Sequence, residues 1–141
     1  MELRLATAIP SGRASSDYFT GTVWVETIIE APAPARIRAA RVTFEPGGRT
    51  FWHTHPLGQT LYVLSGVGLV RSWGETAQVI RPGDVVWIPP GEKHWHGAAP
   101  DKAMIHIALQ ESRDGATVEW LEAVSDSQYA EAAREILPAG R

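Results

Sequence analysis

Short runs of β-branched and aromatic residues recur along the chain, and glycine or proline separates each run from the next. The runs lie at 22–29, 35–44, 60–66, 68–73, 84–89 and 104–110. Between them stand segments such as EPGG, RPGD and PPGE, which favour turns. Short strands at this close spacing predict an all-β barrel or sandwich.

The C-terminal segment has the features of a helix instead. In SDSQYAEAAREI, at 125–136, Ser125 can cap the first turn and Gln128 completes a capping box. The alanines of the same segment favour helix. Since the 141 residues contain no linker or internal repeat, we expect one domain over 1–141 that ends in this short helix.

Composition and charge exclude several classes of function. A net charge of −3, with neither sign in blocks, argues against a nucleic-acid partner. No stretch approaches the roughly 20 apolar residues of a membrane span, so we expect no membrane partner. The absence of cysteine fits a reducing compartment and leaves nitrogen and oxygen atoms as metal ligands. We therefore expect a soluble cytoplasmic protein.

A histidine pair stands out in FWHTHPLGQ, at 51–59. Residues two apart in a strand point to the same face, so His53 and His55 project side by side and can share a metal. The segment PLG then turns the chain, and Gln59 opens the next strand, where a hairpin brings its amide back beside the two imidazoles.

A second pair, His94 and His96, alternates around a tryptophan in PPGEKHWHG. It supplies the third imidazole that a metal site needs. A single H-x-H pattern also fits histidines that are half buried and satisfied by hydrogen bonds, so one pair alone would be weak support for a metal site.

The glycines and prolines around the two pairs resemble the two motifs of the cupin family. The first motif, G-x5-H-x-H-x3,4-E-x6-G, spans 47–66 with glutamine in place of glutamate. The second, G-x5-P-x-G-x2-H-x3-N, spans 83–98 with Ala98 in place of asparagine. The residues that match the two motifs are Gly47, His53, His55, Gly66, Gly83, Pro89, Gly91 and His94, and Gln59 stands at the glutamate position.

This resemblance implies a small jelly-roll barrel, also described as a double-stranded β-helix, with a metal inside its mouth. By the same resemblance the ligands are His53, His55, Gln59 and His94. A closer resemblance covers nearly the whole chain: DYFTGTV, HTHPLGQT, PGDVVWIPPGEKHWHGAAP and VEWLEAVSDSQY are similar to the manganese-dependent cupin hydroxynitrile lyases. The expected reaction is cleavage of a cyanohydrin to an aldehyde or ketone plus hydrogen cyanide. Single-domain cupins of unknown role share the pattern, so fold transfers better than function.

The ligand types also bear on the chemistry. Three neutral imidazoles and a neutral amide leave a divalent cation its full charge, which favours Lewis-acid chemistry over activation of dioxygen. These ligands accept Mn(II), Fe(II), Ni(II), Co(II) or Zn(II). The family resemblance selects Mn(II) among them.

A cyanohydrin lyase also needs a base. On the strand MIHIALQ, His106 shares a face with Ala108 and Gln110, and the isoleucines face the opposite way. We expect His106 to be the general base, with His96 assisting. Gln110, Ala40 and Val42 are the expected substrate contacts, although the last two also fit plain barrel core.

Two other functions remain open from the sequence: a metal-dependent dioxygenase and a non-catalytic cupin that binds a small ligand. The expected partners are a small-molecule substrate and further copies of the chain. Exposed strands and six tryptophans suggest a homodimer or a higher homo-oligomer.

Overall fold

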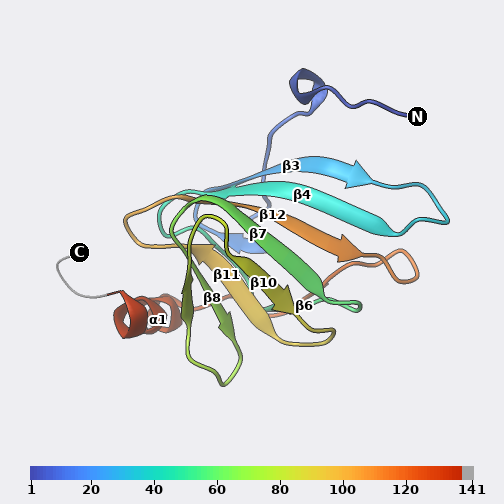
Figure 1. Ribbon diagram of the computed structural model, residues 1–141. Coiled ribbons are helices and arrows are strands. Elements are labelled where there is room, and N and C mark those ends of the chain that lie inside the picture. The colour runs from blue at the N-terminus through green and yellow to red at the C-terminus, as the bar shows by residue number, and fades with distance from the viewer. Residues whose placement is uncertain (138–141) are drawn as a thin grey trace.

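Two antiparallel sheets face each other in the computed structural model, which describes residues 1–137 (Figure 1). The first sheet has the strand order β1 (Gly12–Arg13), β3 (Val23–Glu30), β4 (Ile37–Phe44), β12 (Met104–Glu111), β7 (Gln59–Gly66) and β10 (Val85–Ile88). The second sheet has the order β13 (Glu119–Trp120), β6 (His53–Thr54), β11 (His94–Ala98), β5 (Arg49–Thr50) and β2 (Phe19–Thr20), and β8 (Gly68–Ser72) and β9 (Gln78–Ile80) extend it beside β11. A short 3-10 helix, η1 (Ala6–Ala8), lies near the N-terminus.

The all-β, jelly-roll-like class expected from the sequence is confirmed, with one difference. No ladder among the described residues joins the two sheets, so they form a sandwich and not a closed barrel. The turn between β9 and β10, at Pro82 and Gly83, carries the chain from one sheet to the other. Proline lacks the N–H that a continuing ladder would need there.

The inner faces of the sheets form the first part of the core. Strand β12 shows the expected alternation: Met104, His106 and Ala108 are buried, and the residues between them are half exposed. Phe44 and Val63, from the neighbouring strands, are fully buried against the same layer. The period of two predicted from the sequence therefore holds on the strand that carries His106.

The second part of the core lies between the second sheet and the helix α1 (Asp126–Ile136). Trp52 and Trp95 point away from the inner face and are buried against Tyr129 of the helix and its alanines. The helix begins as the sequence predicts, because the Ser125 side chain accepts from the Gln128 backbone N–H and Gln128 completes the capping box. Among the described residues, no helix is long and apolar enough to cross a membrane.

Candidate functional site

The two histidine pairs meet because β6 and β11 are neighbours in the second sheet. His53 lies directly opposite His94 across this antiparallel pair, and their ring centroids are 4.1 Å apart. The ring of His55 lies 4.9 Å from that of His53 and 5.4 Å from that of His94. Three imidazoles from two distant segments therefore surround one point on the inner face.

Hydrogen bonds to the backbone orient each of these three rings. Nδ1 of His53 lies 2.8 Å from the carbonyl oxygen of Phe51, Nδ1 of His55 lies 2.7 Å from that of Thr117, and Nδ1 of His94 lies 2.9 Å from that of Glu92. A carbonyl only accepts, so each Nδ1 carries the proton and each Nε2 keeps its lone pair. This is the outer hydrogen bond that metal-ligating histidines normally make.

The first residue of β7, Gln59, adds an amide oxygen to the three imidazoles. Gln59 lies opposite Gln110 on β12, and its Nε2 donates to the Gln110 Oε1 at 3.1 Å. The Oε1 of Gln59 is thereby turned toward His94, 3.4 Å from its Nε2. Gln110 thus contacts the expected ligand Gln59 directly, which the sequence did not predict.

His96 lies on the same strand as His94 and contacts a different partner. Its Nδ1 lies 3.0 Å from Nε2 of His106, which projects from the opposite sheet. The outer nitrogens of this pair, Nε2 of His96 and Nδ1 of His106, are buried and have no hydrogen-bond partner among the described residues. The pair therefore has unused donor or acceptor capacity inside the sandwich.

The side chains fit a metal ion in two ways. Ligand atoms of His53, His94 and His96 lie within 4.8 Å of one another, so these three histidines can hold a metal. His53, His55, His94 and the amide of Gln59 are the second set. Nε2 of His55 is buried without a hydrogen-bond partner, which a ligand bond would satisfy. Both sets share His53 and His94.

Burial keeps the imidazoles uncharged. It lowers the pKa of His94 and that of His106 to about 4, and it lowers the pKa of His55. Burial and neighbouring histidines together hold the pKa values of His53 and His96 well below their usual range. Neutral imidazoles can ligate a metal or accept a proton, so at neutral pH these histidines are in the form that such chemistry needs.

A cavity of about 200 Å³ lies between the sheets beside these histidines. Its walls contain every site residue expected from the sequence except His94, namely His53, His55, Gln59, His96, His106, Gln110, Ala40 and Val42. Phe19, Thr117, Val118 and Trp120 also line it, and all four lie outside the two histidine motifs at 47–66 and 83–98. Trp120 pairs with His53 across β13 and β6, with ring centroids 4.8 Å apart.

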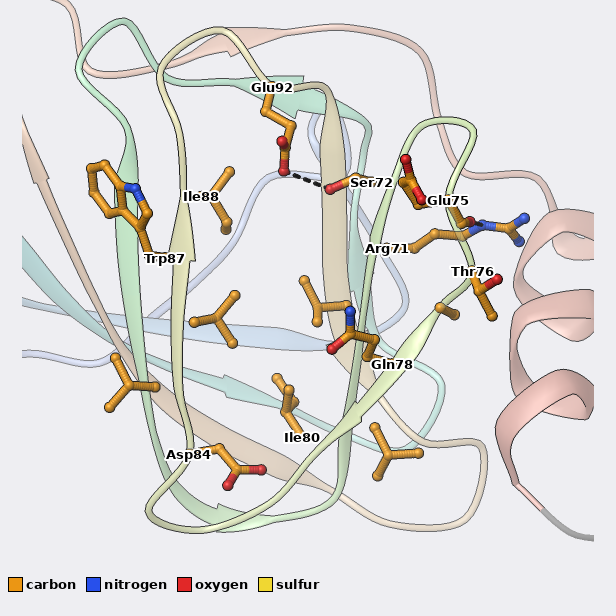
Figure 2. Close-up of a pocket in the computed structure, with 15 residues that line it drawn as sticks. Arg71, Ser72, Glu75, Thr76, Gln78, Ile80, Asp84, Trp87, Ile88 and Glu92 are labelled. Carbon is orange, nitrogen blue, oxygen red and sulfur yellow. Dashed lines mark hydrogen bonds between the residues drawn. The ribbon is translucent and has the colours of Figure 1, made fainter.

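A larger cavity of about 780 Å³ lies where the sandwich is open, between β8, β9 and β10 (Figure 2). Its polar side chains include Arg71, Gln78 and Glu92, and Glu92 accepts a hydrogen bond from Ser72 at 2.7 Å. No histidine lines it. The imidazole cluster therefore makes the smaller cavity the candidate site of chemistry.

The family model described as "Cupin domain" matches residues 40–109. The chain is 54% identical over 129 residues to a protein named (R)-mandelonitrile lyase from Granulicella tundricola, an alignment that covers 92% of this chain and 98% of that protein.

Solved structures are similar as well. A cupin-like protein from Thermotoga maritima superimposes with a TM-score of 0.83 and 41% identity, over 86% of this chain and 92% of that chain. A polyketide cyclase from Streptomyces resistomycificus superimposes with a TM-score of 0.67 and 19% identity, over 92% of this chain and 90% of that chain. At this lower identity the likeness concerns the fold alone.

Proposed function

Because the chain belongs to the cupin family, we propose that it is a metal-dependent hydroxynitrile lyase. In this proposal it cleaves cyanohydrins such as mandelonitrile to an aldehyde or ketone plus hydrogen cyanide, and it also catalyses the reverse addition. The main support is that the chain is 54% identical to a protein named (R)-mandelonitrile lyase, over 98% of that protein's length.

The proposed metal ligands are His53, His55, Gln59 and His94. We prefer this set to the one with His96, because the Nδ1 atoms of His53, His55 and His94 all donate to backbone carbonyls. Nδ1 of His96 contacts another imidazole instead. Mn(II) is the proposed metal, with Fe(II), Ni(II), Co(II) and Zn(II) as alternatives. When bound, a divalent cation supplies Lewis acidity, which stabilises negative charge that develops on the substrate oxygen.

The imidazole pair handles the proton. Two neutral imidazoles carry one N–H each, and one of these hydrogens lies in the bond between His96 Nδ1 and His106 Nε2. Of the two outer nitrogens, one therefore carries a hydrogen and the other a lone pair. The pair can accept a proton at one end while it still offers one at the other.

In the cleavage direction, His106 takes the hydroxyl proton at Nδ1, which has no competing partner among the described residues. The electron pair of the O–H bond becomes the second C–O bond, the bond to the nitrile carbon breaks, and its pair leaves with cyanide. The imidazole pair then returns a proton to cyanide. The lowered pKa of His106, about 4 because of burial, keeps this base unprotonated in mildly acidic solution.

The cavity limits the substrate to a small molecule. Its volume of about 200 Å³ corresponds to about seven times the share of one water molecule in the liquid. Ala40 and Val42 form an apolar wall next to His106, since Val42 is its cross-strand neighbour on β4. Gln110 lies on β12, the strand that carries His106. Its proposed role is to fix the amide of Gln59 and to contact the substrate.

The proposed location is the cytoplasm. The chain has no cysteine, which fits the reducing cytoplasm. A homodimer or higher homo-oligomer is the proposed state.

The test is release of benzaldehyde from mandelonitrile by Mn(II)-loaded protein at mildly acidic pH, with aliphatic cyanohydrins in parallel. Wild type should exceed the uncatalysed background. His106→Ala should keep its metal, and its rate should fall by a factor of about 10² to 10⁴, which is the typical contribution of one positioned acid–base group. An intact rate in this variant would move the base to His96. If no cyanohydrin is cleaved and oxygen uptake appears with a phenolic or diketone substrate, the protein is an oxygenase.

A further inference from the structure

Thr50 is a buried residue of the cavity wall to which the proposed reaction assigns no role. It is 2% exposed and lies on β5, one of the short strands of the second sheet. Its neighbour Arg49 sends its guanidinium to the helix side of this sheet, where it donates to Asp126 at 2.8 Å. Because successive side chains of a strand alternate, Thr50 points to the inner face, toward the cavity.

One hydrogen bond fixes the Thr50 side chain. Gly97 of β11 lies opposite Arg49 of β5, so the next residues in this antiparallel register, His96 and Thr50, also face each other. The backbone N–H of His96 donates to Oγ1 of Thr50 at 3.2 Å. Among residues 1–137 the hydroxyl makes no other hydrogen bond. A hydroxyl can also donate its own hydrogen, so Thr50 has an unused donor in a buried position.

His96 offers a second donor beside Thr50. With Nδ1 of His106 as the base, the hydrogen between the two rings belongs to Nε2 of His106, and His96 carries its hydrogen on its own Nε2. That nitrogen is buried and has no hydrogen-bond partner in the described part of the chain. The Nδ1 hydrogens of His53 and His55, in contrast, are accepted by carbonyl oxygens. Since cross-strand neighbours are about 5 Å apart, Thr50 and His96 can donate to one small ligand.

The surroundings of these two donors favour a ligand that accepts hydrogen bonds. The wall of the same cavity contains apolar side chains, among them Phe19, Val25, Ala40, Val42, Phe44 and Ala108. A buried donor in apolar surroundings costs free energy unless a partner accepts its hydrogen. The ring centroid of His96 lies 5.3 Å from that of His53 and 5.5 Å from that of His94. A ligand at these donors would therefore lie next to two of the proposed metal ligands.

We propose that Thr50 is a further catalytic residue. Its hydroxyl, together with Nε2 of His96, donates hydrogen bonds to the nitrile group of the cyanohydrin and to the cyanide that leaves. This inference rests on the proposed lyase reaction. Thr50 keeps its own proton throughout, and the proton that cyanide finally receives comes from the imidazole pair.

The physical reason is the charge that the departing group acquires. As the C–C bond breaks, its electron pair moves onto the nitrile group, which becomes an anion. Donors that are already in place then stabilise the transition state more than the bound substrate. Thr50 meets this condition, because the bond from His96 anchors its oxygen and a β-branched side chain has few rotamers.

The direct test is the infrared C≡N stretch of phenylacetonitrile bound to the Mn(II)-loaded full chain. This compound is mandelonitrile without its hydroxyl, so it cannot lose cyanide in the proposed reaction. A hydrogen bond to the nitrile nitrogen raises the stretching frequency. We expect a higher frequency in wild type and in Thr50→Ser than in Thr50→Val, which has nearly the same shape and no hydroxyl.

Thr50→Cys is a second variant in case Thr50→Val does not fold. A thiol is a weaker donor than a hydroxyl, so the frequency in Thr50→Cys should be lower than in wild type. The proposal is overturned if the variants that lack the hydroxyl give the wild-type frequency. It is also overturned if phenylacetonitrile does not bind to wild type.

Kinetics separate a catalytic role of Thr50 from a structural one. Thr50→Val should lower kcat for mandelonitrile cleavage by a factor of about 10² to 10³, the range for loss of one donor to a developing anion. Thr50→Ser should recover most of the rate. In the reverse addition, the KM for cyanide should rise in Thr50→Val, while the KM for benzaldehyde and the metal content stay the same.

Thr43→Val is the matched control. Thr43 follows the wall residue Val42 on β4 and therefore points away from the cavity, so this variant should match wild type. Equal changes of both KM values together with loss of metal in Thr50→Val would show a structural role and overturn the proposal. If wild type cleaves cyanohydrins and Thr50→Val keeps its rate, the assignment of Thr50 alone is wrong. If wild type cleaves none, the proposed reaction itself is wrong, and the catalytic role of Thr50 falls with it.

Discussion

At the scale of single residues, the hydrogen bond at the far side of each imidazole distinguishes the proposed ligands from the proposed acid–base pair. His53, His55 and His94 each use Nδ1 on a backbone carbonyl, which leaves Nε2 for a metal. His96 and His106 use a nitrogen on each other. The five imidazoles are similarly buried, and their hydrogen-bond partners are the basis for proposing two different roles.

Metal retention tests this distinction between His55 and His96. We expect His55→Ala to lose bound metal and His96→Ala to keep it, as measured by elemental analysis of purified protein after dialysis. Both positions are buried, so unfolding affects the pair alike and circular dichroism controls for it. Loss of metal in His96→Ala with full retention in His55→Ala would place the metal on His53, His94 and His96.

The glutamine at position 59 can be tested by Gln59→Glu. A carboxylate cancels part of the charge of the cation, so metal binding should tighten while Lewis acidity and the rate of cyanohydrin cleavage fall. The variant loses the N–H that Gln59 donates to Gln110, and Gln110 can compensate by turning its amide to donate. Metal content, cleavage and oxygen uptake would be measured on the same preparations. A fully occupied variant that cleaves as fast as wild type would rule out charge as the reason for the glutamine.

At the scale of elements, the longer strands could be predicted and the short ones could not. The runs at 22–29, 60–66 and 104–110 carry enough apolar positions to show their period, and the structure has strands there. Strands β2 and β13 have two residues each, too few for a pattern. They bring Phe19 and Trp120 to the cavity, so these wall residues escaped prediction. The capping box of α1 was predictable because it is local in sequence.

Strand β11 depends on a close backbone contact at Gly97, between His96 and Ala98. A Cβ atom there would lie 2.5 Å from the Gly48 carbonyl oxygen and 2.7 Å from the Cα of Arg49, both backbone atoms. Gly97→Ala should therefore destabilise the fold by about 1–3 kcal/mol and weaken metal binding by moving His94.

Gly12→Ala is the control for this variant, because the nearest atom to an added Cβ lies 4.0 Å away. Urea unfolding and metal titration of both variants measure the effect. If the two variants are equally stable, the close backbone contact does not restrict residue 97 to glycine.

At the scale of the whole molecule, the sandwich buries all five histidines of the chain. Buried neutral imidazoles make the metal-free fold sensitive to acid. A histidine in the unfolded chain has a pKa of about 6.5, and burial lowers the pKa of His106 in the folded protein to about 4. As the pH falls through this window, the unfolded chain binds a proton that the folded chain does not. Stability is therefore highest above the window and falls as the pH decreases.

We expect the free energy of unfolding of the metal-stripped protein to fall between about pH 6.5 and about pH 4. Each buried histidine contributes about 1.4 kcal/mol per pH unit. His106→Leu should reduce the slope by about that amount, while His94, with its pKa also lowered to about 4, continues to contribute. Denaturant unfolding at several pH values measures both slopes. Equal slopes would mean that His106 does not stay neutral in the fold.

The central claim is that the buried imidazole cluster is a metal-dependent site that cleaves cyanohydrins. The most direct measurement is the rate of mandelonitrile cleavage by one preparation as purified, after removal of metal with a chelator, and after addition of Mn(II). We predict that cleavage falls to the uncatalysed background without metal and returns with it. A rate that survives complete removal of metal, or a fully loaded protein that does not exceed the background, would contradict the account.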